Sequence, residues 1–168
     1  MTQGEPLHDA DRLEEIFALG LLSPDVDPIL KDITNRAASE LGMPVSLVSV
    51  VLDEALMVAA AHGIEGLWLD ETRGHPVEWS FCATSVRTRQ AFIVEDATTN
   101  AEHRANPLVT QDGVRCYAGV PLISSRGFVL GNLCVVGLEE RSFTADELAG
   151  LHRLAAEAVA RIEERRTK

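Results

Sequence analysis

Apolar positions are densest in two neighbouring stretches, residues 114–123 and 129–137. Both stretches are rich in β-branched residues, and Ser-Ser-Arg-Gly at 124–127 separates them, ending in a glycine that can adopt positive φ. This pattern predicts two antiparallel strands joined by a tight turn. Pro121 lacks an amide hydrogen, and Gly131 is typical of a bulge or of a close approach by another segment. We therefore expect a central hairpin that is irregular or one-sided at these two residues.

Helical spacing of apolar residues marks the first part of the chain. A short helix ending near Gly20 would bury one face formed by Leu13, Ile16 and Phe17. A second helix would begin at Asp27-Pro28, with the aspartate as N-cap, and would end at Gly42. The buried stripe of this second helix would consist of Ile29, Leu30, Ile33, Ala37 and Leu41.

The last helix is predicted from a capping box, in which the side chains of Thr144 and Glu147 bond each other's backbone amides. Apolar residues then recur at intervals of three and four up to about Arg165. They are Leu148, Leu151, Ala155, Ala158 and Ile162. Small residues in this stripe would permit close approach of another helix, so we expect a homodimer through this helix and the N-terminal helices. Alternatively, the stripe packs on the protein's own sheet.

Short strands and loops fill the middle of the chain. Asn106-Pro107 would stop a helical turn within the polar segment that precedes the central hairpin. The other expected elements are strands at 45–52, 55–61 and 91–94, a loop at 66–77, and a short helix at 81–88 capped by Ser80. Helices at both ends of a meandering sheet predict the α+β class, with helices on one face. We expect a single domain over 13–164, preceded by a flexible N-terminus at 1–12.

Composition narrows the classes of function. The chain has 168 residues, of which 46% are hydrophobic, so it can build a sizeable core. Its formal net charge of −11 argues against nucleic acid and anionic membranes as partners, because phosphate contacts need lysine and arginine. We recognise no secretory segment and no apolar run long enough to span a bilayer, and we therefore expect a cytoplasmic protein.

The cysteines and histidines point to no metal or cofactor. Cys82, Cys116 and Cys134 are odd in number and widely spaced, unlike a disulfide framework. No spacing typical of a structural zinc site is present. The histidines, His103 among them, lie in predicted loops or on a charged helix, where solvated or capping roles are expected.

Seven short segments, taken together, resemble the GAF domain family over roughly 13–164. The resemblance implies a GAF/PAS-like α+β fold with a central antiparallel sheet of about six strands. It also implies terminal helices on one face, used for dimerisation, and a ligand pocket on the other. The segments are Phe17-Ala18-Leu19-Gly20-Leu21-Leu22, Pro44-Val45-Ser46-Leu47-Val48-Ser49, Ser80-Phe81-Cys82-Ala83, Val94-Glu95-Asp96-Ala97, Asn106-Pro107-Leu108-Val109, Tyr117-Ala118-Gly119-Val120-Pro121-Leu122 and Leu130-Gly131-Asn132-Leu133-Cys134-Val135.

By analogy with that family, the pocket would be walled by residues 79–86, 95–113 and 115–121. The candidate ligand-binding residues in these segments are Trp79, Phe81, Cys82, Thr84, Asp96, Asn106, Arg115 and Tyr117.

Each candidate also has a structural interpretation. Arg115 carries a planar fork that could bind a carboxylate or phosphate of a ligand, or could form an ion pair within the protein. Tyr117 offers an apolar ring with a polar tip. Trp79 and Phe81 are equally typical of a core, and Asn106 is typical of a turn cap.

Three activities known in GAF domains need residues that are not found in this chain. Bilin attachment typically uses a cysteine followed by histidine, whereas Cys82 is followed by Ala83 and Cys116 by Tyr117. The Asn-Lys-Phe-Asp-Glu set of cyclic-nucleotide-binding members is not found, and no histidine lies in an apolar pocket segment as a haem ligand would.

We therefore interpret the sequence as a non-catalytic, small-molecule-binding sensory module that acts in trans on a signalling partner. One alternative is a thiol enzyme similar to free methionine-R-sulfoxide reductase. In that case a helix dipole would activate Cys82 and Cys116 would resolve it within disulfide reach. Cys134 is expected to be a buried, small hydrophobic residue. The other alternative is a ligand-free scaffold for dimerisation or interaction.

Overall fold

The structure is a computed structural model that describes residues 6–23, 25–64, 73–76, 81–101 and 103–164. The elements in chain order are η1 (Pro6–His8), α1 (Ala10–Ala18), α2 (Val26–Leu41), β1 (Val45–Val51), β2 (Ala55–His62), β3 (Gly74–Pro76), α4 (Cys82–Thr88), β4 (Phe92–Val94), η3 (Ala97–Thr99), α5 (Pro107–Thr110), β5 (Cys116–Ile123), β6 (Val129–Gly137) and α6 (Ala145–Glu164). In this part of the chain, no helix is both long and apolar enough to cross a membrane.

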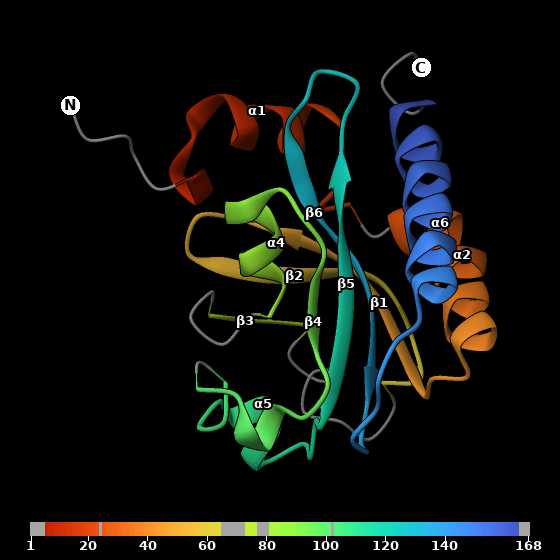
Figure 1. The fold of residues 1–168 in the computed structure, drawn as a ribbon. Coiled ribbons are helices and arrows are strands. Elements are labelled where there is room, and N and C mark those ends of the chain that lie inside the picture. The colour runs from red at the N-terminus through yellow and green to blue at the C-terminus, as the bar shows by residue number, and fades with distance from the viewer. Residues whose placement is uncertain (1–5, 24, 65–72, 77–80, 102, 165–168) are drawn as a thin grey trace.

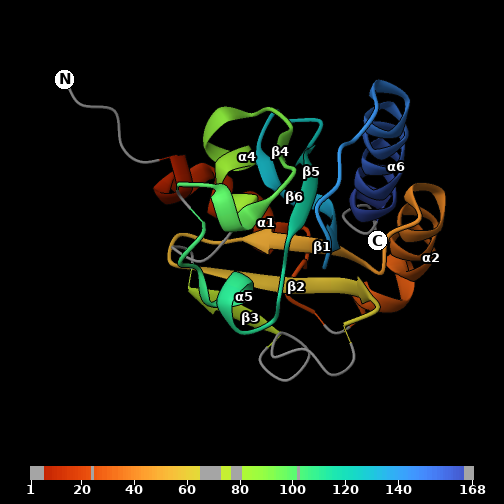
Figure 2. The same cartoon turned by 60° about the horizontal axis from the view of Figure 1, so that its bottom comes forward.

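The strands form one open antiparallel sheet in the order β3-β2-β1-β6-β5-β4. The predicted α+β class is confirmed. Helices α2 and α6 lie side by side on one face of the sheet, and α4 and α5 lie on the other (Figures 1 and 2). Each face buries its own apolar cluster, so the sheet separates two cores.

The central hairpin is formed by β5 and β6, as predicted. Pro121 pairs with Asn132 of β6, but β4 pairs with β5 only as far as Gly119, so the ladder is one-sided at the proline. At Gly131, an added Cβ would lie 1.9 Å from the carbonyl oxygen of Ser49 on β1. The glycine is therefore needed for the close approach of β1 to β6.

The turn at the tip of this hairpin is held from two sides. Glu163 of α6 accepts hydrogen bonds from the amide of Ser125, at 3.1 Å, and from its hydroxyl. On the other side, Arg126 Nη1 lies 3.7 Å from Glu15 Oε1 of α1. Gly127 closes the turn with φ of 87°. The hairpin tip thus connects α1 with the end of α6.

Helix α2 binds the part of β2 that extends beyond β3. Asp27 accepts a hydrogen bond from the amide of Ala61 at 3.3 Å, and Lys31 donates to the carbonyl of the same residue. Asn35 bonds the His62 ring at 2.7 Å. These three helix residues are four apart, so they lie on one face of α2 and cover an otherwise open strand edge.

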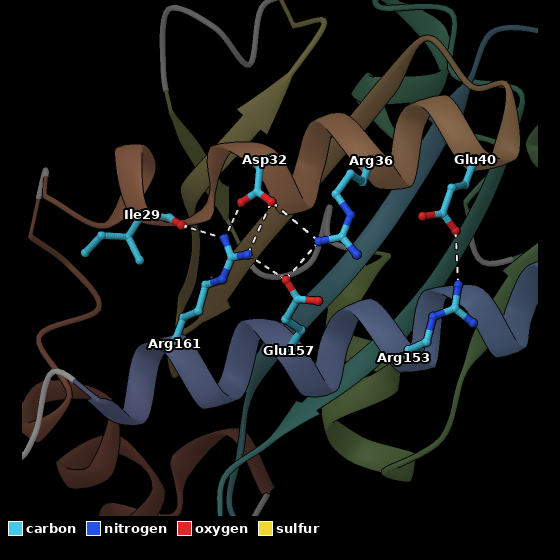
Figure 3. Close-up of polar contacts among 7 residues, drawn as sticks. All are labelled: Ile29, Asp32, Arg36, Glu40, Arg153, Glu157 and Arg161. Atoms are coloured by element: carbon cyan, nitrogen blue, oxygen red, sulfur yellow. Dashed lines mark hydrogen bonds and ion pairs between the residues drawn. The ribbon is translucent and has the colours of Figure 1, made fainter.

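Helices α2 and α6 are also joined by charged side chains on their outer surface (Figure 3). Arg161 bonds both carboxylate oxygens of Asp32, and it bonds Glu157 at 2.6 Å. Arg36 bridges the same two carboxylates, at 2.8 Å from Glu157 and 3.4 Å from Asp32. These contacts lower the pKa values of both carboxyl groups and join the outer faces of the two helices.

The apolar stripe predicted for the last helix packs inside the chain. Leu151, Ala155, Ala158 and Ile162 are buried in the same cluster as α2 and the sheet. The alternative interpretation, packing on the protein's own sheet, is the one observed. The predicted capping box is also present, with the Thr144 amide 2.9 Å from Glu147 Oε1 and the Glu147 amide 3.1 Å from Thr144 Oγ1.

The N-terminal region differs most from the sequence-based expectations. The segment predicted to be flexible contains η1 and the start of α1, and Leu7 is buried in the core under α4. Phe17, predicted to be buried, is 61% exposed, because α1 turns Arg12, Glu15 and Ile16 inward instead. Helix α2 begins at Val26 after an Asp25 N-cap rather than after Asp27.

Two further segments were assigned incorrectly from sequence. The predicted loop at 66–77 contains strand β3, which pairs with β2. Asn106-Pro107 starts a helix rather than stopping one, because Asn106 Oδ1 accepts the Leu108 amide at 2.9 Å and proline is tolerated in a first turn. The Ser80 cap lies outside the described residues.

Arg12 anchors α1 to the ends of two central strands. Its guanidinium group, 3% exposed, donates to the carbonyl oxygens of Val51 at 2.7 Å, Val129 at 3.0 Å and Leu7 at 3.0 Å. Burial lowers the pKa of Arg12, but an arginine remains charged in a protein. This one side chain therefore ties together three segments that are distant in sequence.

We predict that Arg12→Ala lowers the free energy of unfolding by about 3 kcal/mol, because three buried carbonyl groups lose their charged donor. Urea denaturation measures this loss. Arg104→Ala, at an exposed position, should change it by less than about 0.5 kcal/mol. A loss below about 1 kcal/mol for Arg12→Ala would show that it is not an anchor.

Candidate functional site

A cavity of about 40 Å³ lies between the sheet and the layer formed by α4, α5 and the turn that follows α5. Its floor comes from β1, β2, β5 and β6, and its roof from the start of α4 and from residues 108–114. The walls are apolar apart from Asp112 and the polar atoms of Tyr117 and two cysteines. The apolar side chains include Leu47, Leu56, Phe81, Leu108, Val114 and Val136.

Tyr117 is the central residue of this site. Its ring stacks on Phe81 with centroids 5.1 Å apart. The hydroxyl oxygen lies 3.1 Å from Asn132 Oδ1 and 3.2 Å from Cys82 Sγ. Burial raises the pKa of Tyr117 well above its usual value, so the phenol stays neutral. A Cβ at Gly119 would lie 2.3 Å from the hydroxyl oxygen, so this glycine makes room for the contact.

His103 joins the aromatic group beside the cavity. Its ring stacks on Phe81 with centroids 4.1 Å apart, and Phe92 lies at a tilt, 5.8 Å away. Of the two expected roles, solvated or capping, the solvated one was wrong for His103, because the residue is 4% exposed. Nothing local in the sequence distinguishes it, because its burial depends on aromatic residues from other segments.

The three cysteines are divided between the two faces of the sheet. Cys82 and Cys134 belong to the core under α4, whereas Cys116 lies in the core under α2 and α6. The thiol-enzyme alternative needs Cys82 and Cys116 within disulfide reach, and the intervening sheet separates these two residues. A hydrogen bond with Cys82, followed by burial, raises the pKa of Cys134 well above its usual value, and burial raises that of Cys116. Cys134 is fully buried, as expected.

Arg115 and Asp96 bind each other rather than the cavity. The guanidinium Nε and Nη2 atoms lie 3.0 Å from the two oxygens of the carboxylate. Asp96 also accepts the Thr98 amide at 3.0 Å, which caps η3. The Arg115 hydrogen bond is the main reason why the pKa of Asp96 is lowered to about 2. Neither side chain lines the cavity, so the ion-pair interpretation of Arg115 is the one observed.

Of the remaining candidate residues, some line the cavity and others do not. Phe81 and Cys82 meet Tyr117 at the cavity wall. Asn106 is buried and caps α5, and the half-buried Thr84 does not line the cavity. Trp79 lies outside the described residues.

The expected pocket walls did not include β1, β2 or β6, which line the floor of the cavity. Val136 pairs with Tyr117, and Cys134 pairs with Gly119. Residues two apart on a strand share a face, so these two side chains point to the same side as Tyr117. The alternation on β6 was a signal that could have identified them.

A family model described as GAF domain matches residues 23–163, which is well over half of the chain. The chain therefore belongs to the GAF domain family, a class of sensory, ligand-binding domains.

Among known proteins, a cyclic di-GMP phosphodiesterase of Pseudomonas aeruginosa is 32% identical over 163 residues. The match covers 96% of this chain but 27% of that protein, so the chain spans about a quarter of its length.

Two solved structures share the fold. The GAF domain/HD domain protein of Geobacter sulfurreducens has a TM-score of 0.69 and 18% identity, covering 90% of this chain and 99% of the other. The free methionine-R-sulfoxide reductase of Neisseria meningitidis, in complex with its substrate, has a TM-score of 0.65 and 17% identity, covering 99% and 95%. At these identities the likeness shows the fold alone.

The Asp96–Arg115 ion pair makes the free energy of unfolding depend on pH in the acid range. An aspartate in an unfolded chain has a pKa of about 3.9, whereas the pKa of Asp96 in the folded protein is about 2. A lowered folded pKa stabilises the protein above the unfolded pKa, and this stabilisation is lost as the pH falls toward 2.

We predict that Arg115→Met raises the pKa of Asp96 toward about 3.9, as carboxyl NMR titration would detect. Arg126→Met should leave it unchanged, and an unaltered pKa in Arg115→Met would contradict the pairing.

Proposed function

We propose that this GAF domain is a non-catalytic sensory module that binds a small molecule in the cavity at Tyr117 and acts in trans on a signalling partner. The observation that carries the proposal is the cavity itself, which lies between two layers and has apolar walls. Apolar walls with a few polar groups are typical of ligand sites, and at about 40 Å³ this cavity must widen to admit a ligand of ordinary size.

The hairpin gives the cavity a physical connection to the helical layer. Tyr117 and Cys134 lie in the core on the cavity side, whereas their neighbours Ala118 and Val135 lie in the core that contains α6. A ligand that displaces β5 or β6 therefore alters the surface on which α6 packs. Because Glu163 also bonds the hairpin tip, the end of α6 is coupled to the same two strands.

The cysteine geometry argues against a thiol enzyme that uses Cys82 and Cys116. A nucleophilic thiol needs a resolving partner within about 7 Å between Cα atoms, and Cys116 lies across the sheet from Cys82. Cys134 does contact Cys82, but it is fully buried and its pKa is raised well above its usual value, so this thiol stays protonated, whereas exchange requires a thiolate.

Homodimerisation stays a prediction. The stripe first expected to form the interface is buried within the chain. A dimer through α6 would instead use its outward face, where Ala149, Ala156 and Ala160 are exposed. A ligand-free scaffold would also be compatible with such a dimer, so occupancy of the cavity separates that alternative from a sensor.

We predict that native mass spectrometry of the full chain, purified from the cells that produce it, detects a bound small molecule. Leu108→Trp places a larger side chain in the cavity wall and should abolish the bound mass, with the fold retained by circular dichroism. Leu22→Trp, at an exposed position, is the control and should keep it. Absence of any bound mass, or its retention in Leu108→Trp, would overturn the proposal.

We also predict that the protein shows no thioredoxin-coupled oxidation of NADPH when free methionine sulfoxide is added. Cys82→Ser keeps an acceptor for the Tyr117 hydroxyl, so it should change the free energy of unfolding by less than about 1.5 kcal/mol. Turnover by the wild type that disappears in Cys82→Ser would establish an enzyme instead of a sensor.

A further inference from the structure

A second hollow lies at the edge of the sheet and shares no lining residue with the cavity at Tyr117. Strand β4 pairs with β5 only as far as Gly119, so the last residues of β5 form an outer edge. A groove of about 220 Å³ lies there between this edge, α6 and the residue that caps α4. Its lining side chains include Arg89, Pro121, Ile123, His152, Ala156 and Val159.

Most of the groove is apolar. Pro121 and Val159 are buried and form its floor, whereas Ile123 of β5 is 38% exposed and Ala156 of α6 is exposed as well. Apolar surface that faces water over a hollow is stabilised when another apolar group covers it. The groove therefore favours a ligand with an apolar body.

The polar side chains of the groove are both nitrogen donors. Arg89 keeps its positive charge, and the His152 ring has at least one N–H donor. Among the described residues that line the groove, none is an aspartate or a glutamate. In the part of the chain that the structure describes, neither of the two side chains forms a hydrogen bond or an ion pair. An anionic group can therefore bind both without displacing a partner.

Arg89 occupies a position that the backbone prefers to give to glycine. It caps the C-terminus of α4 in the left-handed conformation, with φ of 61°, whereas Gly42 has the same role at the end of α2. A side chain costs conformational energy there, and no bond of the guanidinium group within the described residues offsets it. The fold alone thus does not explain an arginine at this position.

The size and the edge of the groove limit its occupant. An engineered apolar cavity of about 150 Å³ holds one benzene ring, so this larger groove, of about 220 Å³, matches roughly nine non-hydrogen atoms. Pro121 has no amide hydrogen, so this edge is poorly suited to pairing with an added strand. Both features favour a small molecule over an extended peptide.

We propose that the groove binds a small monocarboxylate with an apolar body of about six carbon atoms. Arg89 and His152 bind the carboxylate, and the body covers Ile123 and Ala156. The net charge of −11 does not prevent this, because charges more than about 10 Å away are largely screened at 0.1 M salt. The inference goes beyond the function proposed for the cavity, since it concerns a separate site.

The test compares two probes of equal size that differ in charge. The full chain, labelled with ¹⁵N, is titrated with cyclohexanecarboxylate and with cyclohexanecarboxamide at neutral pH. The carboxylate should shift the amide signals of Ile123, Ala156 and Val159 in a saturable way. The carboxamide should bind at least about threefold more weakly, because it lacks the charge-assisted hydrogen bonds. No saturable shift with the carboxylate, equal or tighter binding of the carboxamide, or shifts centred on Tyr117 instead would overturn the inference.

Two pairs of variants assign the binding to the groove. Arg89→Gln should weaken the carboxylate at least about threefold and leave the carboxamide unchanged. Arg153→Gln, on α6 but bonded to Glu40 outside the groove, should change neither. Ala156→Phe fills the groove and should abolish binding of both probes. Ala149→Phe, at an exposed position about two turns earlier on α6, should not.

Circular dichroism checks that each variant keeps the fold. Equal affinity of Arg89→Gln and the wild type for the carboxylate, or retained binding in Ala156→Phe, would contradict the assignment.

A peptide with a free C-terminus offers the same chemistry and is tested separately. A tetrapeptide that ends in leucine should bind more weakly than cyclohexanecarboxylate, because the edge at Pro121 gives its backbone no regular partner. Tighter binding of the peptide would overturn the small-molecule class. The mass bound in the cavity and its loss in Leu108→Trp concern the other site, so the two proposals can fail independently.

Discussion

Burial of the central hairpin on both faces is the constraint on which the rest of the structure depends. Every residue of β6, and every residue of β5 up to Leu122, is buried. A strand packed on both sides cannot change its position without altering both cores, because protein interiors are close-packed. Small residues make this packing feasible: Gly119 makes room for the Tyr117 hydroxyl, and Gly131 for the backbone of β1. Part of the cavity floor belongs to this hairpin, so a displacement of that floor disturbs both cores.

Sequence rules succeeded where a segment carries its own signal. The capping box of α6 could be predicted because its bonds join residues three apart, and Gly42 ends α2 in the left-handed conformation. The orientation of α1 could not be predicted in the same way. This helix has nine residues, too few turns to fix its buried face by periodicity alone. Its inward positions are decided by the strand-end carbonyl groups that Arg12 binds, and these come from distant segments.

In the candidate site, too, residues in recognisable motifs could be placed from the sequence, whereas contacts between distant segments could not. Family resemblance located Phe81, Cys82 and Tyr117 at the cavity, because those residues lie in segments whose order and spacing define the fold. For Arg115 the sequence left a ligand contact and an ion pair open, because its partner, 19 residues earlier, could not be recognised from the sequence. The pairing of Cys82 with Cys116 could have been rejected in advance. Adjacent strand residues face opposite sides of a sheet, so Cys116 and Tyr117 cannot both face one pocket.

The two kinds of contact between α2 and α6 have different consequences for signalling. Apolar residues such as Leu30, Ile33 and Leu154 are buried in a common core and hold the two helices on the sheet. The network of Asp32, Arg36, Glu157 and Arg161 lies outside that core, where exposed ion pairs contribute little stability. Its geometry nevertheless selects one register, because both arginines bind the same two carboxylates. A displacement of β5 and β6 would act first on the apolar surface beneath α6, and the ion pairs could rearrange at small cost. Under the proposed sensory function, the outer face of the helix pair is therefore the surface through which binding in the cavity would be reported.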